Sequence, residues 1–318
     1  MLQWLNNNKY PEFWKNYLSN FKDKSNKYVV LSIESTGLNT SKDVILAFSA
    51  VTVNADRITI REALELYISY SKFKMEDGAK VNTTAIVRGK IKDNAWVEAQ
   101  EIFEAKPYTK TSYHYGSRIT FDKKGHLFFS VGERGMEKVF PQNLDNDNGK
   151  IHRLNDDGSV PSDNPFKNSD HPSIYSYGQR NPQGLTTNPW TGDIWETEHG
   201  PRGGDEINII QAGKNYGWPV ITYGINYDGK PISAISKKDG MEQPISYFIP
   251  SIAPSGLTFV TGDKYPAWKG NLMIGSLRFN YLNRVEVKNN KVVKQEKVLL
   301  NVGRMRNVQQ GRDGYLYI

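Results

Sequence analysis

The stretch NPWTGDIWETE, residues 188–198, decides the fold, because a polar turn ends in Gly192 and runs directly into an alternating strand. The same turn, glycine and strand recur in GHLFFSVG from residue 125, GNLMIGSL from 270 and GYLYI from 314. In chain order the glycines are 67, 78 and 44 residues apart, so the repeat is loose. The strand pattern suits a β-propeller and a β-sandwich equally well. The long polar loops favour the propeller, whose insertions gather on one face.

The composition is that of a globular protein with a core: 38% of the 318 residues are apolar and 24% are charged. No apolar run approaches the ~20 residues that span a bilayer, and no membrane span is expected. The 41 basic residues are scattered, and the net charge of +7 predicts a solvated surface rather than a nucleic-acid site. The lack of cysteine excludes disulfides and thiolate chemistry.

The pattern of predicted secondary structure changes near residue 65. Residues 10–21 place aromatic side chains on one face of a predicted helix, and residues 27–34 and 44–53 are apolar, β-branched strands. After that point the pattern predicts short strands and loops almost throughout. We therefore divide the chain into a small α+β fragment, residues 1–65, and a mainly β domain, residues 66–318.

A histidine and an acid flank the first of the glycine-led strands. His114 precedes one predicted strand and Glu133 ends the next, and two antiparallel strands joined by a tight turn would bring the two side chains together. A carboxylate beside an imidazole orients the ring and favours its charged form, which suits a general base. The alternative is an ordinary loop histidine and a surface acid, and the spacing alone favours that alternative.

Two loops carry polar groups that suit bound oxygen atoms or cations. Arg180 and Asn181 precede a proline in a glycine-flanked loop, and such a pair can hold a carboxylate or a carbonyl oxygen. The loop EHGPRGGDE, residues 198–206, offers backbone carbonyls followed by Asp205 and Glu206, the hard oxygen ligands that Ca²⁺ takes. Taken singly, the first segment is also an ordinary turn and the second an ordinary glycine-rich loop.

Basic residues gather in the last part of the chain. Arg304 and Arg306 alternate in VGRMRNV, and in a strand both would face the same way. Together with Arg278 in SLRFNYL, two guanidinium groups on one face suggest an anionic ligand. An exposed strand face explains the same pattern without any ligand.

Taken in order, six segments are similar to the soluble aldose sugar dehydrogenases that use pyrroloquinoline quinone (PQQ): HYGSRITF, GERG, NGKIHRLNDDGSVPSDNPF, IYSYGQRNPQGL, EHGPRGGDEINII and NYGWPVITYG. The resemblance covers about residues 66–318. It implies a mainly β fold, a six-bladed β-propeller with the flat quinone over its axis, and oxidation of aldoses to lactones with an external electron acceptor. The family's first portion and last segments are missing from the chain, so we expect an incomplete propeller of about five blades.

The resemblance assigns the matching residues to catalysis, cofactor binding or calcium binding. They are, for catalysis, His114, Glu133 and Arg180; for the cofactor, Asn181, Ser251, Arg278, Arg304 and Arg306; and for Ca²⁺, Gly200, Pro201, Glu206 and Tyr216. In this assignment His114 takes the proton of the anomeric hydroxyl. The carbonyls of Gly200 and Pro201 bind the catalytic Ca²⁺, and Glu206 with the carbonyl of Tyr216 belongs to a second, structural Ca²⁺.

The N-terminal fragment has a resemblance of its own. Residues 29–58 resemble the opening strands of DnaQ-like 3′–5′ exonucleases, in which an Asp-x-Glu pair before Thr-Gly holds Mg²⁺. Here Ser32 replaces the first acid and Glu34 remains, so no exonuclease activity is expected. An exonuclease-related protein and a non-catalytic propeller that binds a partner are the alternatives to an oxidoreductase. The quinoprotein family is typically periplasmic or extracellular, whereas the first residues lack the pattern of a secretory signal.

Overall fold

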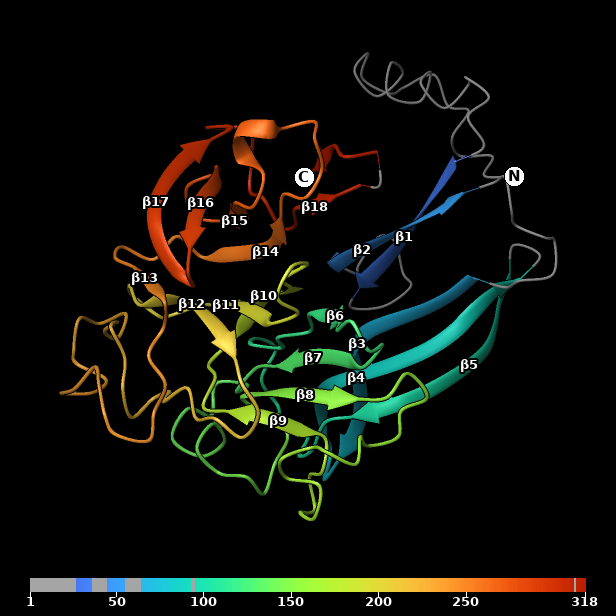
Figure 1. The fold of residues 1–318 in the computed structure, drawn as a ribbon. Coiled ribbons are helices and arrows are strands. Elements are labelled where there is room, and N and C mark those ends of the chain that lie inside the picture. Colours follow the sequence, from blue (N-terminus) through green and yellow to red (C-terminus); the bar gives the residue numbers. More distant parts are fainter. Residues whose placement is uncertain (1–26, 36–44, 55–63, 93–94, 312) are drawn as a thin grey trace.

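The computed structural model describes residues 27–35, 45–54, 64–92, 95–311 and 313–318. Its elements are β1 Lys27–Ser35, β2 Ile45–Asn54, β3 Leu64–Glu76, β4 Ala79–Lys92, β5 Ala95–Glu104, β6 Ile119–Phe121, β7 Leu127–Val131, β8 Lys150–Leu154, β9 Ile174–Tyr177, β10 Pro182–Thr187, β11 Ile194–Glu198, β12 Asp205–Ile210, β13 Ser246–Phe248, β14 Pro254–Phe259, the 3₁₀ helix η3 Pro266–Trp268, β15 Leu272–Ser276, β16 Leu282–Lys288, β17 Lys291–Val298, β18 Gln309–Gln310 and β19 Leu316–Tyr317. Figure 1 shows a mainly β molecule, as the sequence predicted.

From residue 64 onward, the described strands form five sheets in succession along the chain (Figure 1). Three of them have four strands, in the orders β6-β7-β8-β9, β10-β11-β12-β13 and β14-β15-β16-β17. The sheet β3-β4-β5 precedes them and the pair β18-β19 follows. The first strands β6, β10, β14 and β18 lie next to one another, which is the arrangement of a propeller around its axis. The number of blades stays a prediction, because the first and last of these sheets have fewer than four described strands.

The middle strands are covered on both faces by neighbouring sheets. All residues of β7, β8, β11 and β15 are buried. Successive side chains of a strand point to opposite faces, so Phe128 packs with Ile194 toward the next sheet whereas Phe129 packs toward β4 and β5. Trp195, the neighbour of Ile194, likewise joins the core that β14 and β15 share. Each interface between successive sheets therefore has an apolar core of its own.

The glycine-led strands were predicted correctly. Gly125, Gly192, Gly270 and Gly314 have φ values of 86°, 85°, 82° and 84°, a left-handed conformation that glycine adopts without steric cost. The strand begins two residues later in each case, as β7, β11, β15 and β19. These strands are the second members of four successive sheets. The loose sequence repeat therefore marks one turn that each of these sheets uses to reverse the chain.

The first sheet differs from the short strands that the sequence predicted. β3 and β4 have 13 and 14 residues and pair with each other along their whole length. Bulges near Ile86 and Arg88 shift the register between β4 and β5, where the long strands bend. The proposed domain boundary at residue 65 falls inside β3 and stays a prediction.

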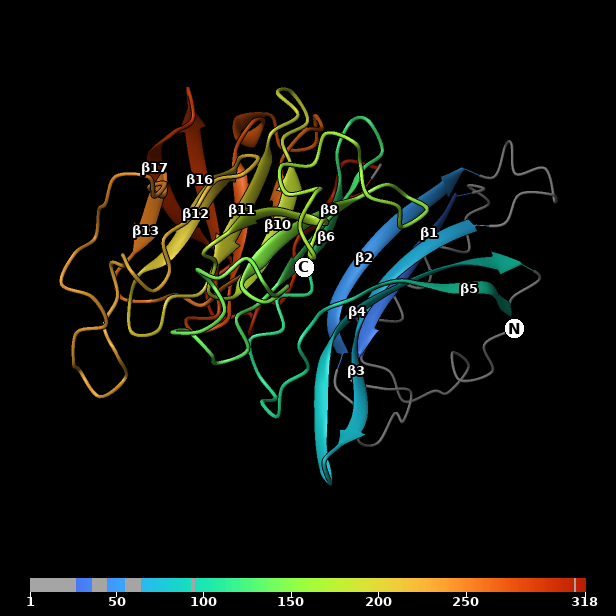
Figure 2. The ribbon, with the colours of Figure 1, turned by 90° about the horizontal axis from the view of Figure 1, so that it is seen from below.

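The N-terminal strands pair with each other, as expected from their apolar sequences. β1 and β2 form an antiparallel hairpin in which Ser32 lies opposite Ser49 and Glu34 opposite Ala47. β1 lies beside β3 without joining its sheet (Figure 2). The helix predicted over residues 10–21 lies outside the described residues.

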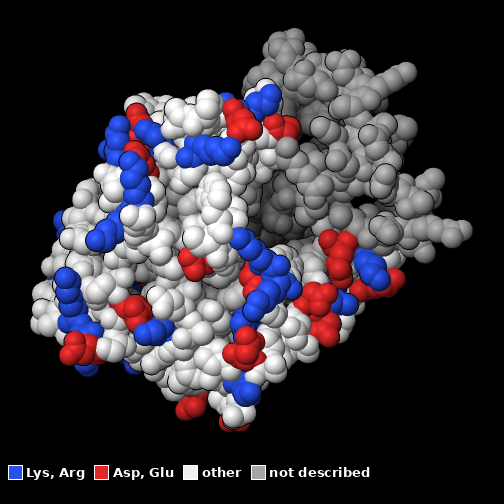
Figure 3. Space-filling view, viewed as in Figure 1, with Lys and Arg blue, Asp and Glu red and all other residues white. Residues whose placement is uncertain are grey.

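Charged side chains cover the surface in mixed order. Figure 3 shows Lys and Arg interspersed with Asp and Glu on one face of the molecule, in line with the scattered basic residues of the sequence. Within the described part of the chain, none of the helical segments has the length and apolarity to cross a membrane.

His152 ties the first sheet to the second. Its ring, fully buried in β8, stacks on Phe129 with a centroid distance of 5.2 Å and lies 4.9 Å from Phe103 of β5. Nε2 donates to the Asp147 carbonyl at 2.8 Å, because a carbonyl oxygen can only accept, and Nδ1 then accepts from the Ser173 hydroxyl at 3.0 Å. Burial lowers the pKa of His152 to about 4.

This burial makes His152 a source of acid instability. The unfolded chain binds a proton near pH 6.5 and the folded chain near pH 4, so stability falls on acidification through that window. Between pH 7 and pH 5 the loss is about 2 kcal/mol, at ~1.4 kcal/mol for each pKa unit. Urea unfolding of wild type and His152→Gln at both pH values should show a steeper loss in the wild type. Equal losses in the two proteins would contradict this assignment.

Candidate functional site

Ten of the twelve residues assigned by resemblance, all except Glu206 and Tyr216, lie at equivalent places in successive sheets. One group lies in the loops that lead into the first strands, namely His114 before β6, Arg180 and Asn181 before β10, Ser251 before β14, and Arg304 and Arg306 before β18. The other group follows the second strands, namely Glu133 after β7, Gly200 and Pro201 after β11, and Arg278 after β15. First and second strands are antiparallel, so both groups of loops lie at the same end of each sheet.

His114 and Glu133 are in contact, as the sequence predicted. β6 pairs with β7, and this pairing places Nδ1 of His114 against Oε1 of Glu133. Glu133 is 1% exposed, and its carboxylate fixes the ring with a hydrogen on Nδ1 and a lone pair on Nε2. Burial lowers the pKa of His114, and the nearby charges of Arg180 and Arg134 act in the same direction, while the Glu133 bond opposes them. The ring is therefore neutral at pH 7 and ready to accept a proton.

The loop before β10 joins this pair to the next sheet. The Glu133 amide donates to the Arg180 carbonyl at 2.8 Å, and Oδ1 of Asn181 accepts from the Gly116 amide at 3.2 Å. Arg180 is buried, and its Nη1 donates to the carbonyls of His199 at 2.9 Å and Gly200 at 3.3 Å. The structure therefore brings Arg180 and Asn181 to the His114 pair, and Arg180 also to the turn predicted to bind Ca²⁺.

Asp205 holds that turn against the loop before β14. Its carboxylate, with no exposure, accepts from the amides of Gly200 at 2.8 Å, Ile252 at 2.7 Å and Ala253 at 2.9 Å, and from the Ser251 hydroxyl at 2.7 Å. Protein donors thus reach both carboxylate oxygens, and the side chain clamps the two loops together. Its role as a Ca²⁺ ligand, which the sequence suggested, stays a prediction.

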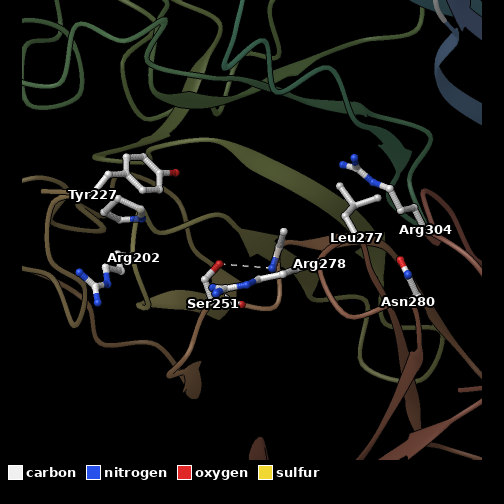
Figure 4. A pocket seen from close by; sticks show the side chains of 9 residues that line it. Arg202, Tyr227, Ser251, Leu277, Arg278, Asn280 and Arg304 are labelled. Carbon is white, nitrogen blue, oxygen red and sulfur yellow. Dashed lines mark hydrogen bonds between the residues drawn. The ribbon is translucent and has the colours of Figure 1, made fainter. Parts of the chain in front are cut away.

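A pocket of about 650 Å³ opens beside this clamp (Figure 4). Its lining residues are Pro201, Arg202, Tyr227, Ser251, Ala253, Leu277, Arg278, Asn280 and Arg304. Figure 4 shows Arg202 and Tyr227 on one side and Leu277, Asn280 and Arg304 on the other, with Ser251 and Arg278 between them. Nη1 of Arg278 donates to the Ser251 carbonyl at 3.2 Å. The pocket unites predicted residues from three successive sheets and adds Arg202 and Tyr227, which the sequence analysis missed.

Arg306 is placed differently from Arg304. The segment is irregular rather than a strand, and Arg306 is not among the residues that line the pocket. Its carbonyl accepts from Nη2 of Arg118 at 2.9 Å and from the Ser255 hydroxyl at 2.7 Å. Burial lowers the pKa of Arg306, and the like charge of Arg304 acts in the same direction. The expectation that both side chains share a strand face is wrong.

Three carboxylates meet between β11 and β12. Glu196 lies opposite Asn208 and Glu198 opposite Glu206, and Nδ2 of Asn208 donates to Glu196 at 3.0 Å and to Glu206 at 3.2 Å. Burial raises the pKa of Glu198 to about 7 and those of Glu196 and Glu206 well above their usual value. Among the described residues, Oε1 of Glu196 and Oδ1 of Asn208 are buried without a hydrogen-bond partner.

These oxygens are of the kind that suits Ca²⁺ near Glu206. Among the residues that the structure describes, no three acidic, histidine or cysteine side chains converge closely enough to enclose a metal by themselves. Backbone carbonyls or water would have to complete the site. Tyr216 lies after β12, and its hydroxyl donates to the Ile209 carbonyl at 2.6 Å. The role of its own carbonyl stays a prediction.

The chain is similar to known proteins over most of its length. The model of the glucose/sorbosone dehydrogenase family matches residues 59–318. The aldose sugar dehydrogenase of Escherichia coli (strain K12) is 41% identical over 264 residues, 81% of this chain and 70% of that protein. A crystal structure of the soluble aldose sugar dehydrogenase from Escherichia coli, in the apo form, has a TM-score of 0.75 at 42% identity, covering 80% of this chain and 74% of that one.

Two further relatives have names or titles that mention a quinone. Quinoprotein glucose dehydrogenase B of Acinetobacter calcoaceticus is 36% identical over 126 residues, 34% of this chain and 26% of that protein. The PQQ-bound form of the aldose sugar dehydrogenase from Streptomyces coelicolor has a TM-score of 0.60 at 22% identity and covers 89% of each chain. This second likeness shows the fold alone, which is mainly β and propeller-like, in line with the predicted fold class.

The clamp makes a prediction for Asp205→Asn. An amide group cannot accept from donors on both of its ends, so at least one buried amide loses its partner. We expect a loss of about 3 kcal/mol in the free energy of unfolding, measured with urea. Asp193→Asn is the matched control, because Asp193 accepts from Thr191 in an exposed turn, and it should change stability by less than about 0.5 kcal/mol. Equal effects of both variants would rule out the clamp.

Proposed function

The chain belongs to the glucose/sorbosone dehydrogenase family, and on that premise we propose that it oxidises the anomeric hydroxyl of an aldose to the lactone. The proposed hydride acceptor is PQQ, with Ca²⁺ at the quinone. The observation that carries the proposal is the His114–Glu133 pair, which Arg180 and the Gly200 turn connect to an arginine-lined pocket. A general base and a basic pocket are what such an oxidation requires.

The pocket suits a small, flat anion. Three guanidinium groups, those of Arg202, Arg278 and Arg304, line a volume that is typical of small-molecule sites. PQQ carries several carboxylates, and arginine matches carboxylate geometry better than lysine does. When bound, the quinone would supply a carbonyl carbon that takes the hydride, and Ca²⁺ would stabilise the charge on its oxygen. Arg306 and Asn181 are proposed as further cofactor contacts on the resemblance alone.

His114 is the proposed general base. Glu133 accepts the Nδ1 hydrogen, so the Nε2 lone pair is the atom that takes the proton of the sugar's anomeric hydroxyl. The electrons of that O–H bond form the lactone C=O bond while the hydride leaves C1 with two electrons. Besides burial, the charge of Arg180 lowers the pKa of His114, and a contact of Arg180 with the sugar or quinone oxygen is proposed on the resemblance.

Calcium has two proposed places. The carbonyls of Gly200 and Pro201 are proposed as ligands of the catalytic ion, in a turn whose Pro201 lines the pocket and whose Gly200 carbonyl accepts from Arg180 at 3.3 Å. Glu206 and the carbonyl of Tyr216 are proposed for the structural ion. An external electron acceptor and export to the periplasm or outside the cell remain proposals that rest on the family.

Cofactor binding is tested first by thermal unfolding. A ligand that binds only the folded state stabilises it by about 2.7 kcal/mol at 100 times its Kd. Titration with PQQ and Ca²⁺ should raise Tm with ligand concentration, and Arg278→Gln should weaken this rise. Arg284→Gln is the matched control, since Arg284 pairs with Glu296 on the outer strands. A Tm that does not respond to PQQ and Ca²⁺ in wild type would contradict the proposal and favour a non-catalytic propeller.

The base is tested by dye reduction with an aldose, PQQ and Ca²⁺. His114→Gln should lose most turnover, by at least about 100-fold, and keep the Tm response to PQQ, because the base acts in the chemical step. His126→Gln should keep both, although His126 also pairs with a carboxylate, Asp122, at 2.8 Å in a turn.

The pH dependence of turnover is an independent test of His114 as the base. A protonated ring cannot accept a proton, and the pKa of His114 is lowered from 6.5. Turnover should therefore fall to half its maximum below pH 6.5 on acidification. Full turnover by His114→Gln, or a half-point above pH 6.5, would remove His114 from the proposed role.

A further inference from the structure

Arg134 is a buried cation beside the candidate base that the mechanism above does not use. We propose that Arg134 is a positioning residue, which holds the loop on both sides of His114 and thereby aims the imidazole at the substrate. The inference rests on the proposed function of His114. Arg134 follows Glu133 directly after β7, and its side chain has no exposure to solvent.

The contacts of Arg134 bracket His114 in the sequence. Nη1 donates to the Tyr113 carbonyl at 2.5 Å, and Nη2 donates to the Thr111 carbonyl at 2.7 Å. On the other side of His114, the guanidinium carbon lies 3.5 Å from the ring centroid of Tyr115. The Thr111 hydroxyl donates in return to the Arg134 carbonyl at 2.7 Å. One planar group therefore fixes both neighbours of the base.

The loop needs such a support because its backbone is strained at the base itself. His114 has a φ of 56°, in the left-handed region that is sterically unfavourable for a residue with a Cβ atom. Backbone hydrogen bonds hold the loop near its ends, where Thr109 pairs with Asn82 and Ser117 with Ser130. The guanidinium group of Arg134 supports the loop between these two pairs of residues, next to His114.

Arg134 and Tyr115 are also hydrogen-bonded to the first sheet, β3-β4-β5. Oδ1 of Asn82 in β4 accepts from Nη2 of Arg134 and from the Tyr115 hydroxyl, the latter at 2.7 Å. Asn82 is 4% exposed and Arg134 has no exposure, so the hydrogen bond between them is buried. Lysine cannot replace Arg134, because a single ammonium group lacks the planar fork that stacks on a ring and donates to several acceptors at once.

The test compares Arg134→Lys with Arg153→Lys. Arg153 is a matched control: it is 7% exposed, its Nε donates to Asn164 at 2.6 Å, and its guanidinium lies 5.1 Å from the Tyr175 ring. Both variants should lose stability. Arg134→Lys alone should lower kcat by about 10- to 100-fold, the size expected for a base displaced by about 1 Å, and leave the Tm response to PQQ unchanged.

A spectroscopic readout separates this proposal from the function on which it rests. The chain has five histidines, and ¹⁵N-histidine spectra of the protein without cofactor, assigned with His114→Gln, should show the His114 signals moving in Arg134→Lys and not in Arg153→Lys. Unchanged His114 signals, or equal kcat losses in both variants, would overturn the positioning role. A wild type that oxidises no aldose would instead overturn the proposed function, and the His114 signals would then decide the positioning role alone.

Discussion

Burial of the middle strands on both faces is the constraint on which the rest of the structure depends. Because Phe128 and Phe129 point into different interfaces, β7 has no free face on which a reactive group could meet a ligand. Polar groups that act on ligands are therefore confined to strand ends. The chain enters each first strand and leaves each second strand at the same end of its sheet, so loops distant in sequence gather there. His114, Arg180 and Ser251 occupy such loops in three successive sheets.

The carboxylates of β11 and β12 are exceptions, because these polar groups lie within the strands rather than at their ends. Glu196, Glu198 and Glu206 lie inside the sheet, where an unpaired charge is costly, and the Asn208 amide satisfies two of them in part. Such a group is neutralised either by protons or by a cation. The raised pKa values describe the first state. On the proposal that Ca²⁺ binds near Glu206, proton and cation would compete for the same oxygens.

The sequence predicted what local patterns determine and missed what distant partners determine. A glycine after a polar turn shows where a strand begins, and two strands joined by a short turn show that His114 meets Glu133. The clamp that Asp205 forms was missed because its partner Ser251 lies 46 residues away, and no local pattern reports that contact. Arg134 was passed over because Asn82 belongs to a sheet whose long strands the sequence did not predict. Catalytic roles came from resemblance, because spacing alone favoured an ordinary loop.

The separate apolar core of each interface has a further consequence. A sheet shares an apolar core only with the sheets on either side of it. Apolar packing therefore couples the stability of each sheet mainly to that of its neighbours. Substitutions in cores that share no sheet should add independently, whereas two in one core should not. A disturbance of β3–β5 would reach β14–β17 through the sheet β6–β9, and from there either through the sheet β10–β13 or through Arg118, whose Nη2 donates to the Ser255 hydroxyl of β14 at 2.9 Å. The cooperativity of unfolding should therefore be limited by the least stable of the interfaces between neighbouring sheets.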